Sequence, residues 1–199
     1  QLLQIGATWR VMAFRNLDYE TTIKDAVQMS LCTHYDPRCS VATAVLTSIL
    51  WHLIYDKEKP ESYVLNMVDQ ICEMYTLTEG SCEEAKEWCK KQTLDEMRLN
   101  DQIGYSLKCM GVAVWAYKNR TRPYKEVILE IVLKGGDADT NAAVAGSILG
   151  TFHGFQRLPQ EWLIKLPNKE WLDKKCKLFI ETIEQLDQRS SSDQSSRSL

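Results

Sequence analysis

The sequence predicts an all-α fold. Apolar residues recur every three or four positions in most segments, as in residues 63–75, which is the spacing of a helix that buries one face. Residues that commonly begin helices, Asp18 and the pair Asp36-Pro37, come just before such segments. The run 127–133 is short enough for a strand, but its lead-in and the lack of a hairpin partner favour a helix. No convincing strand is left, so we expect helices throughout.

Two helices are expected in the first third of the chain. Asp18 caps the first, which ends near residues 32–35. Asp36 and Pro37 begin the second, with a capping carboxylate followed by proline at the first helical position. This second helix is apolar almost all round as far as Ile54, so we expect it to be buried near the middle of a bundle.

The next segments are more charged. After a link over residues 57–60, a third helix is expected to end at Gly80. Residues 81–84 have the pattern of a capping box for a fourth helix, which reaches about Arg98. Its glutamates and lysines are interpreted as a solvated face and not as an acid–base pair.

The second half contains four more expected helices. They begin at residues 103–106, after residues 121–123, at residues 137–140 and at Lys169. Gly146, Gly150 and Gly154 recur every four residues along one face, which predicts close backbone packing in the core. Pro159 and Pro167 mark a short linker, and the last helix covers residues 169–188. We therefore expect one domain over residues 1–188 and a disordered, serine-rich tail over residues 189–199.

Composition narrows the function classes. The 199 residues suffice for one well-buried domain, and their 44% hydrophobic and 26% charged content is typical of a globular protein. The net charge of -3 disfavours nucleic acid as a partner. The longest apolar stretch, residues 41–55, is interrupted by polar residues and is interpreted as too short to cross a membrane.

The cysteine pattern predicts a reducing compartment. Seven cysteines form an odd set without a C-x-x-C pair, which argues against a zinc ribbon and against a secreted disulfide framework. We expect most of them to be buried as small apolar side chains. This predicts an intracellular, cytoplasmic protein.

The segment 135–141 carries the strongest chemical signal. Gly135 and Gly136 permit a sharp turn, and Asp137, Asp139 and Thr140 follow at the start of the next expected helix. Carboxylate and hydroxyl oxygens are the ligands that Mg²⁺ and Ca²⁺ prefer.

Two other interpretations of this segment were weighed. Asp and Thr before an apolar run are common helix caps, which require no metal. An EF-hand loop is excluded, because Ala142 stands where the turn glycine is required and Ile148 where the bidentate glutamate is required.

Among the three histidines, His34 is the candidate binding residue. It lies in a joint just before an expected helix start, where free amides favour an anion such as phosphate. A histidine hydrogen-bonded to a turn is the alternative. His52 lies on a buried apolar face and is interpreted as a core residue.

Several segments resemble the ADP-ribosylglycohydrolase family. Residues 133–146, with Gly-Gly-Asp-Ala-Asp-Thr, are similar to the C-terminal signature of this family, and residues 33–38 are similar to its Thr-His-x-x-Pro joint. Residues 6–11 resemble its Asn-Gly-Ala-x-Met-Arg segment, but Ile5 and Trp9 replace the Asn and the Met. Ile103-Gly104-Tyr105 resembles its Gly-Tyr turn.

The resemblance implies a compact orthogonal helix bundle that hydrolyses ADP-ribose linkages. It implies Mg²⁺, or Mn²⁺, held by Asp137, Asp139 and Thr140. ADP-ribose or an ADP-ribosylated protein is the implied partner, and the implied substrate-binding residues are His34, Gly104, Tyr105, Gly135 and Gly136.

One part of the family pattern is missing from this sequence. The family carries a Thr-Asp-Asp cluster that completes a two-metal site, and no Asp-Asp pair occurs in these residues. The chain is therefore expected to match the C-terminal two-thirds of a family member, with impaired activity and no assigned catalytic acid. A catalytically inactive ADP-ribose-binding or structural domain is the alternative.

Overall fold

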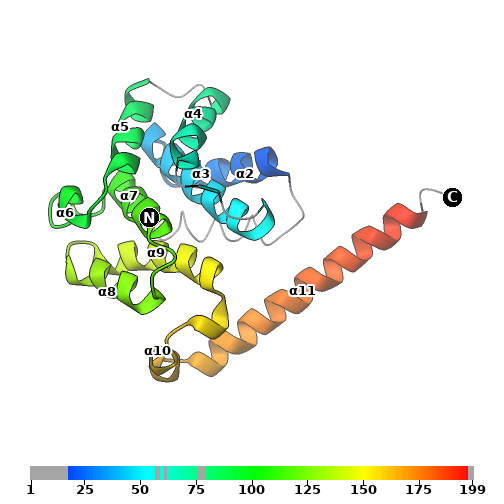
Figure 1. Ribbon diagram of the computed structural model, residues 1–199. Helices are drawn as coiled ribbons and strands as arrows, with labels where there is room; N and C mark the ends of the chain where they lie inside the picture. The colour runs from blue at the N-terminus through cyan, green and yellow to red at the C-terminus, as the bar shows by residue number, and fades with distance from the viewer. Residues whose placement is uncertain (1–17, 57–58, 61, 76–78, 197–199) are drawn as a thin grey trace.

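The computed structural model describes residues 18–56, 59–60, 62–75 and 79–196 of the chain. In this part the chain forms α-helices and two short helical turns, without strands, so the all-α prediction is confirmed (Figure 1). The elements are α2 (Tyr19–Leu31), α3 (Pro37–Trp51), the π-helical turn η1 (His52–Asp56), α4 (Tyr63–Tyr75), α5 (Glu79–Lys90), α6 (Leu94–Met97), α7 (Ser106–Lys118), α8 (Tyr124–Leu133), α9 (Ala138–His153), the 3-10 turn η2 (Phe155–Arg157), α10 (Gln160–Lys165) and α11 (Lys169–Ser196).

Helix α3 is the centre of the bundle, as predicted. It contacts α2, α4, α5, α7 and α9, and every residue from Cys39 to Leu50 is buried. Its polar residues are tolerated there because their hydroxyls are hydrogen-bonded. Thr47 Oγ1 donates to the carbonyl of Thr43 at 2.7 Å, and Thr43 Oγ1 donates to Ser30 Oγ of α2 at 3.2 Å.

The same helix and η1 form one apolar stretch. In the part of the chain that the structure describes, Pro37–Tyr55 is long and apolar enough, by length and composition alone, to cross a membrane. This stretch begins four residues before the predicted one, which covered residues 41–55 and was therefore too short. Inside the fold 72% of the apolar window is buried, which is typical of a core helix.

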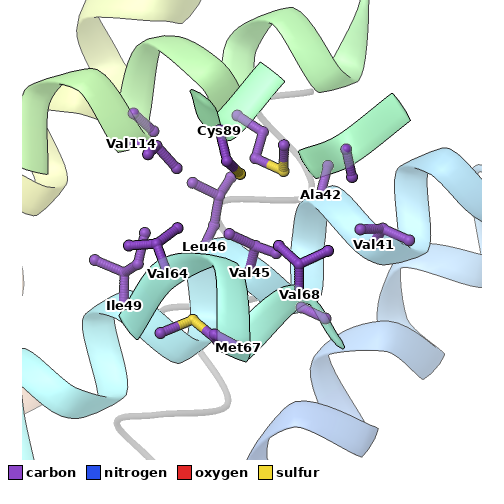
Figure 2. Packing of buried hydrophobic residues seen from close by; sticks show 14 of the residues in the cluster. Val41, Ala42, Val45, Leu46, Ile49, Val64, Met67, Val68, Cys89 and Val114 are labelled. Carbon is purple, nitrogen blue, oxygen red and sulfur yellow. The ribbon is translucent and has the colours of Figure 1, made fainter. Parts of the chain in front are cut away.

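Two groups of buried apolar residues stabilise the bundle. Figure 2 shows the first, in which side chains of α3, α4, α5 and α7 meet; Leu46, Val64, Met67, Cys89 and Val114 are among them. The second joins α7 to α8 and α9. Because α7 contributes to both groups, it links the α2–α5 half of the molecule to the α8–α9 half.

The predicted starts of α2 and α3 are confirmed in detail. The carboxylate of Asp18 accepts a hydrogen bond from the Thr21 amide at 2.9 Å, and Asp36 accepts one from the Arg38 amide at 2.9 Å with Pro37 at the first helical position. Both caps satisfy amides that lack a partner inside the helix.

The region around Gly80 differs from the prediction. Helix α4 ends at Tyr75, and Gly80 lies in the first turn of α5, so neither the glycine stop nor the capping box at Ser81 is correct. No neighbouring atom comes within 4 Å of a Cβ at Gly80, so packing does not require glycine at this helical position.

The predicted fourth helix is also interrupted. Helix α5 ends at Lys90 and a short helix, α6, follows. The break is a capping box that the sequence analysis did not use: Thr93 Oγ1 accepts from the Glu96 amide at 3.3 Å, and the Glu96 carboxylate accepts from the Gln92 amide at 3.1 Å.

The C-terminal part is more helical than predicted. The linker between the two prolines contains α10, and α11 continues past residue 188 to Ser196. In Figure 1, α11 extends away from the bundle. The division into one domain and a disordered tail stays a prediction.

The glycine repeat of α9 packs closely at only one position. A Cβ at Gly146 would lie 3.0 Å from the Tyr124 hydroxyl, whereas Gly150 has no neighbouring atom within 4 Å. Gly154 also has no neighbour and lies just beyond the helix, with φ at +77°. The prediction is therefore correct for Gly146 and wrong for the other two.

A disulfide joins α4 to α5, which the cysteine count did not predict. Cys72 and Cys82 are linked, with their Cα atoms 6.2 Å apart. Cys39, Cys89 and Cys109 are buried thiols, as expected, and Cys32 and Cys176 are exposed thiols. The intracellular location stays a prediction.

Candidate functional site

The first turns of α3 and α7 lie side by side and form a hollow of about 170 Å³. Their contact is direct, because Cys39 Sγ lies 3.6 Å from Ser106 Oγ. The hollow is lined by His34, Asp36, Arg38, Cys39, Gly104, Tyr105 and Ser106. The structure thus brings together three of the predicted binding residues. His34 lies about 70 positions before the adjacent pair Gly104 and Tyr105 in the chain.

His34 is held at the rim of this hollow. Its amide donates to the carbonyl of Ser30 at 2.9 Å, and its Nδ1 lies 2.9 Å from Thr33 Oγ1. The side chain is exposed. The turn hydrogen bonds that offered an alternative role are therefore present, and they fix an imidazole that still faces solvent beside the hollow.

The start of α3 is neutralised by its own cap. Asp36 accepts from Arg38 Nε at 2.9 Å and from Arg38 Nη2 at 2.6 Å, in addition to the amide bond of the cap. These bonds from Arg38 lower the pKa of Asp36 to about 2. A phosphate in this hollow would therefore meet His34 and the edge of a paired guanidinium, and not a bare helix start.

Tyr105 lines this hollow and a second one. The second hollow, of about 510 Å³, is lined by Arg38, Glu84, Gln102, Ile103, Gly104 and Tyr105. The Tyr105 ring lies under the Arg38 guanidinium, with 5.7 Å from Cζ to the ring centroid, and its hydroxyl donates to Glu84. Burial and then the bond to Glu84 raise the pKa of Tyr105 to about 12, so its hydroxyl remains protonated at neutral pH.

The loop between α6 and α7 shapes both hollows, and a buried lysine holds it. Lys108, only 4% exposed, donates through Nζ to the carbonyls of Arg98, at 2.9 Å, and Asp101. Burial lowers the pKa of this lysine. The loop then places Gly104, with φ at +87°, at the wall of the hollows.

The other end of this loop packs on the glycine pair. A Cβ on Gly136 would lie 2.0 Å from the carbonyl oxygen of Leu99, and a Cβ on Gly135 would lie 2.8 Å from Asn100 Oδ1. Both glycines have positive φ, at +72° and +67°. Gly135 and Gly136 thus make a close approach to the loop that carries Gly104 and Tyr105, and they do not line either hollow.

The acidic corner lies at the start of α9, as predicted. Asp137 is the N-cap residue but its side chain makes no capping hydrogen bond. Asp139 Oδ1 accepts from the Thr140 amide at 2.8 Å. Thr140 is 7% exposed. The Asp137 carboxylate therefore does not cap its own helix, and Asp139 has a second oxygen, Oδ2, that is not bonded to the Thr140 amide.

The charge of Asp137 acts on a buried thiol of α7. Burial, and after it the charge of Asp137, raise the pKa of the Cys109 thiol to about 12. Cys109 is one turn beyond Ser106, which lines the first hollow. Asp137, Asp139 and Thr140 are not among the residues that line the first hollow.

The donor set at the corner fits a hard divalent cation in kind but not in number. Two carboxylates and a hydroxyl are suitable oxygen donors for Mg²⁺, which requires six ligands. In the described ranges of the chain, no group of three or more His, Cys, Asp or Glu side chains is placed to hold a metal. Any further ligands would have to be water, substrate or other protein oxygens.

The comparisons with known proteins assign the chain to a family. The sequence model described as ADP-ribosylglycohydrolase matches residues 4–193. The chain belongs to the ADP-ribosylglycohydrolase family. The match covers all the segments that carried the resemblance; residues 6–11 are among them but lie outside the described residues.

The curated relatives are longer than this chain. It is 28% identical to the ADP-ribosylarginine hydrolase Tri1 of Serratia proteamaculans (strain 568) over 157 residues, which are 79% of this chain and 40% of that protein. It is 41% identical to the ADP-ribosyl-[dinitrogen reductase] glycohydrolase of Rhodospirillum rubrum over 49 residues, which are 25% and 17% of the two chains. A putative ADP-ribosyl glycohydrolase, L543, of Acanthamoeba polyphaga mimivirus is 22% identical over 73% of this chain and 46% of its own. No solved structure gives a significant match.

In this family member, several lining residues were missed by the sequence analysis. Asp36 and Arg38 belong to the same segment 33–38 as His34, so the family joint pointed near them. Glu84 lies on α5, whose glutamates were interpreted as a solvated face. Nothing in the sequence alone indicates that Glu84 meets Tyr105 across 21 positions.

Proposed function

We propose that this chain carries the ADP-ribose-binding part of a hydrolase that removes ADP-ribose from modified protein side chains. The observation that supports it most is the convergence of His34, Gly104 and Tyr105 at one hollow. The names of the relatives, which describe an ADP-ribosylarginine hydrolase and an ADP-ribosyl-[dinitrogen reductase] glycohydrolase, support an ADP-ribosylated arginine or protein as the proposed substrate class.

In this proposal the two hollows receive the nucleotide. His34 and Arg38 face its diphosphate, because both present N–H donors at the first hollow. Tyr105 offers an aromatic face for a ring of the substrate, and its bond to Glu84 fixes the orientation of that face. The loop held by Gly136 and Lys108 places Gly104 at the wall of both hollows, where it adds no side chain.

We further propose that Asp137, Asp139 and Thr140 hold Mg²⁺ or Mn²⁺. When bound, such an ion supplies positive charge that orients ribose hydroxyls and a water molecule. Asp137, whose carboxylate makes no capping bond, is the principal ligand. Asp139 contributes the oxygen that is not bonded to the Thr140 amide.

A second candidate function is binding of ADP-ribose without hydrolysis. It is favoured by the donor count at the corner, where the described residues supply two carboxylates and one hydroxyl. On this basis we expect the 199 residues to bind ADP-ribose more readily than they hydrolyse an ADP-ribosylated arginine.

Calorimetry with ADP-ribose, with and without Mg²⁺, tests these proposals. We expect ADP-ribose to bind more tightly when Mg²⁺ is present. In the presence of Mg²⁺, an Asp137→Asn variant should bind ADP-ribose about tenfold more weakly than wild type, a difference of ~1.4 kcal/mol. The matched control is Asp173→Asn on α11, whose carboxylate pairs with Lys169; its affinity should be unchanged. A parallel assay for release of ADP-ribose from ADP-ribosylarginine separates the hydrolase from the binding domain.

Each outcome decides one proposal. No binding of ADP-ribose under either condition would refute the assignment of the hollows. Equal binding with and without Mg²⁺, unchanged in Asp137→Asn, would refute the metal site and leave the hollows in place.

A further inference from the structure

A third hollow lies at the opposite end of α3 and has no role in the proposed function. Its volume is about 730 Å³, and four aromatic residues and two glutamates dominate its lining: Tyr19, Trp51, His52, Tyr63, Glu20 and Glu73. Trp51 is the last residue of α3, while the first hollow lies at its first turn. At 1.5 Å per residue the two hollows are about 20 Å apart along the helix, so this is a separate site.

The aromatic side chains form one continuous wall. The Tyr19 ring lies 5.3 Å from Trp51 and 5.4 Å from His52, and the His52 ring lies 5.2 Å from Tyr63, all between centroids. His52 is 6% exposed, and the Tyr19 hydroxyl is hydrogen-bonded to Ser48 of α3. Because packing holds the rings in place, a ligand would not have to order them.

The charged residues that line the hollow are both acidic. Glu20, in the first turn of α2, and Glu73, near the end of α4, are exposed at its edge, and its lining residues include no lysine or arginine. One ring already attracts a cation, since the Lys59 ammonium lies 5.4 Å from the Tyr63 ring centroid. Aromatic faces and carboxylates together favour a cation over a neutral or anionic ligand.

We propose that this hollow binds a quaternary ammonium group. A trimethylammonium group has a spread positive charge and no N–H donors, so it gains from aromatic faces without needing a hydrogen-bond acceptor for each proton. The two glutamates supply the balancing negative charge. A primary ammonium keeps a tighter hydration shell, which the aromatic wall does not replace.

Choline and its neutral isostere 3,3-dimethylbutan-1-ol test this proposal on the full chain. The two probes have the same shape, and only choline carries a charge. We expect choline to bind by calorimetry or by shifts of its methyl NMR signal, and the isostere to bind at least about fivefold more weakly. Glu73→Gln should weaken choline binding, and the matched control Glu170→Gln, in the first turn of α11, should leave it unchanged.

Competition with ADP-ribose locates the site. Choline binding should persist when ADP-ribose saturates the protein, since the hollows lie at opposite ends of α3. Absence of choline binding, equal affinity for the neutral isostere, or displacement by ADP-ribose would each overturn the proposal. Thermal unfolding of Glu73→Gln checks that the variant is folded, and Glu20→Gln provides a second test if it is not.

Discussion

At the residue scale, Asp36 combines a structural and a site role. Its carboxylate caps α3 and pairs with Arg38, and these bonds lower its pKa to about 2. A folded-state pKa below the ordinary value of about 3.9 means that the ionised form stabilises the fold. This contribution is complete above about pH 4 and is lost as the pH falls toward 2.

We therefore predict a pH-dependent effect of Asp36→Asn. At pH 7 the variant should lose about 0.5–1 kcal/mol of unfolding free energy, because the pair is partly exposed and its worth is reduced by solvent. Between pH 4 and 2 the difference from wild type should shrink to nearly zero. Urea unfolding at several pH values measures this difference. A constant difference between pH 4 and 2 would contradict the lowered pKa of Asp36.

The residues of the site were predictable where a motif named them, and not elsewhere. His34, Gly104 and Tyr105 were identified from short motifs, and the structure places them at one hollow. Glu84 was missed because its role arises only when α5 packs beside the start of α7. A tertiary contact of this kind leaves no local signal in the sequence.

At the element scale, the contact between the glycine pair and the α6–α7 loop is the tightest of the site. Gly136→Ala should be strongly destabilising, since its Cβ would lie 2.0 Å from the Leu99 oxygen at a φ of +67°. We expect a loss of at least ~2 kcal/mol, of which the left-handed backbone accounts for about 1–2 kcal/mol. Binding of ADP-ribose should weaken as well, because the same loop carries Tyr105.

Gly150→Ala in α9 is the matched control for this prediction. No atom lies within 4 Å of its Cβ position and the residue is inside a helix, so alanine should stabilise the protein by about 0.5–1 kcal/mol. Denaturant unfolding of both variants gives the comparison. A Gly136→Ala protein as stable as wild type would show that the loop is free to move away.

Helix ends were predicted well where a side chain caps them. Asp18 and Asp36 were correct because their carboxylates bond the amides that follow. Gly80 was wrong because glycine permits a helix end without requiring one. Thr93 was missed although it does cap a helix. Its capping box begins α6, whereas the predicted helix continued through this position to about Arg98.

At the scale of the whole molecule, stability is concentrated around α3. Leu50 on α3 is 2% exposed, and replacing it by alanine should lower the unfolding free energy by about 2–5 kcal/mol. Leu178 on α11 is 56% exposed, and replacing it by alanine should change the unfolding free energy by no more than about 0.5 kcal/mol. Thermal and urea unfolding of the two variants compare them; a large effect of Leu178→Ala would show that α11 is covered in solution.

The overall architecture was accessible from sequence for a physical reason. Helical periodicity is a local property, so the all-α class could be predicted from the apolar spacing of most segments. The buried character of α3 could be predicted from residues 41–54. The disulfide was not accessible in this way. It depends on α4 and α5 bringing Cys72 and Cys82 to a Cα separation of 6.2 Å, which the odd cysteine count obscured.

That covalent bridge makes a closed ring of the chain between positions 72 and 82. A protease that cuts once within the ring would leave both pieces tied together through sulfur. On a gel without reductant, nicked and intact protein would then migrate alike, and only dithiothreitol would release the two fragments. Digests that are judged under non-reducing conditions would therefore overestimate how resistant this segment is to cleavage.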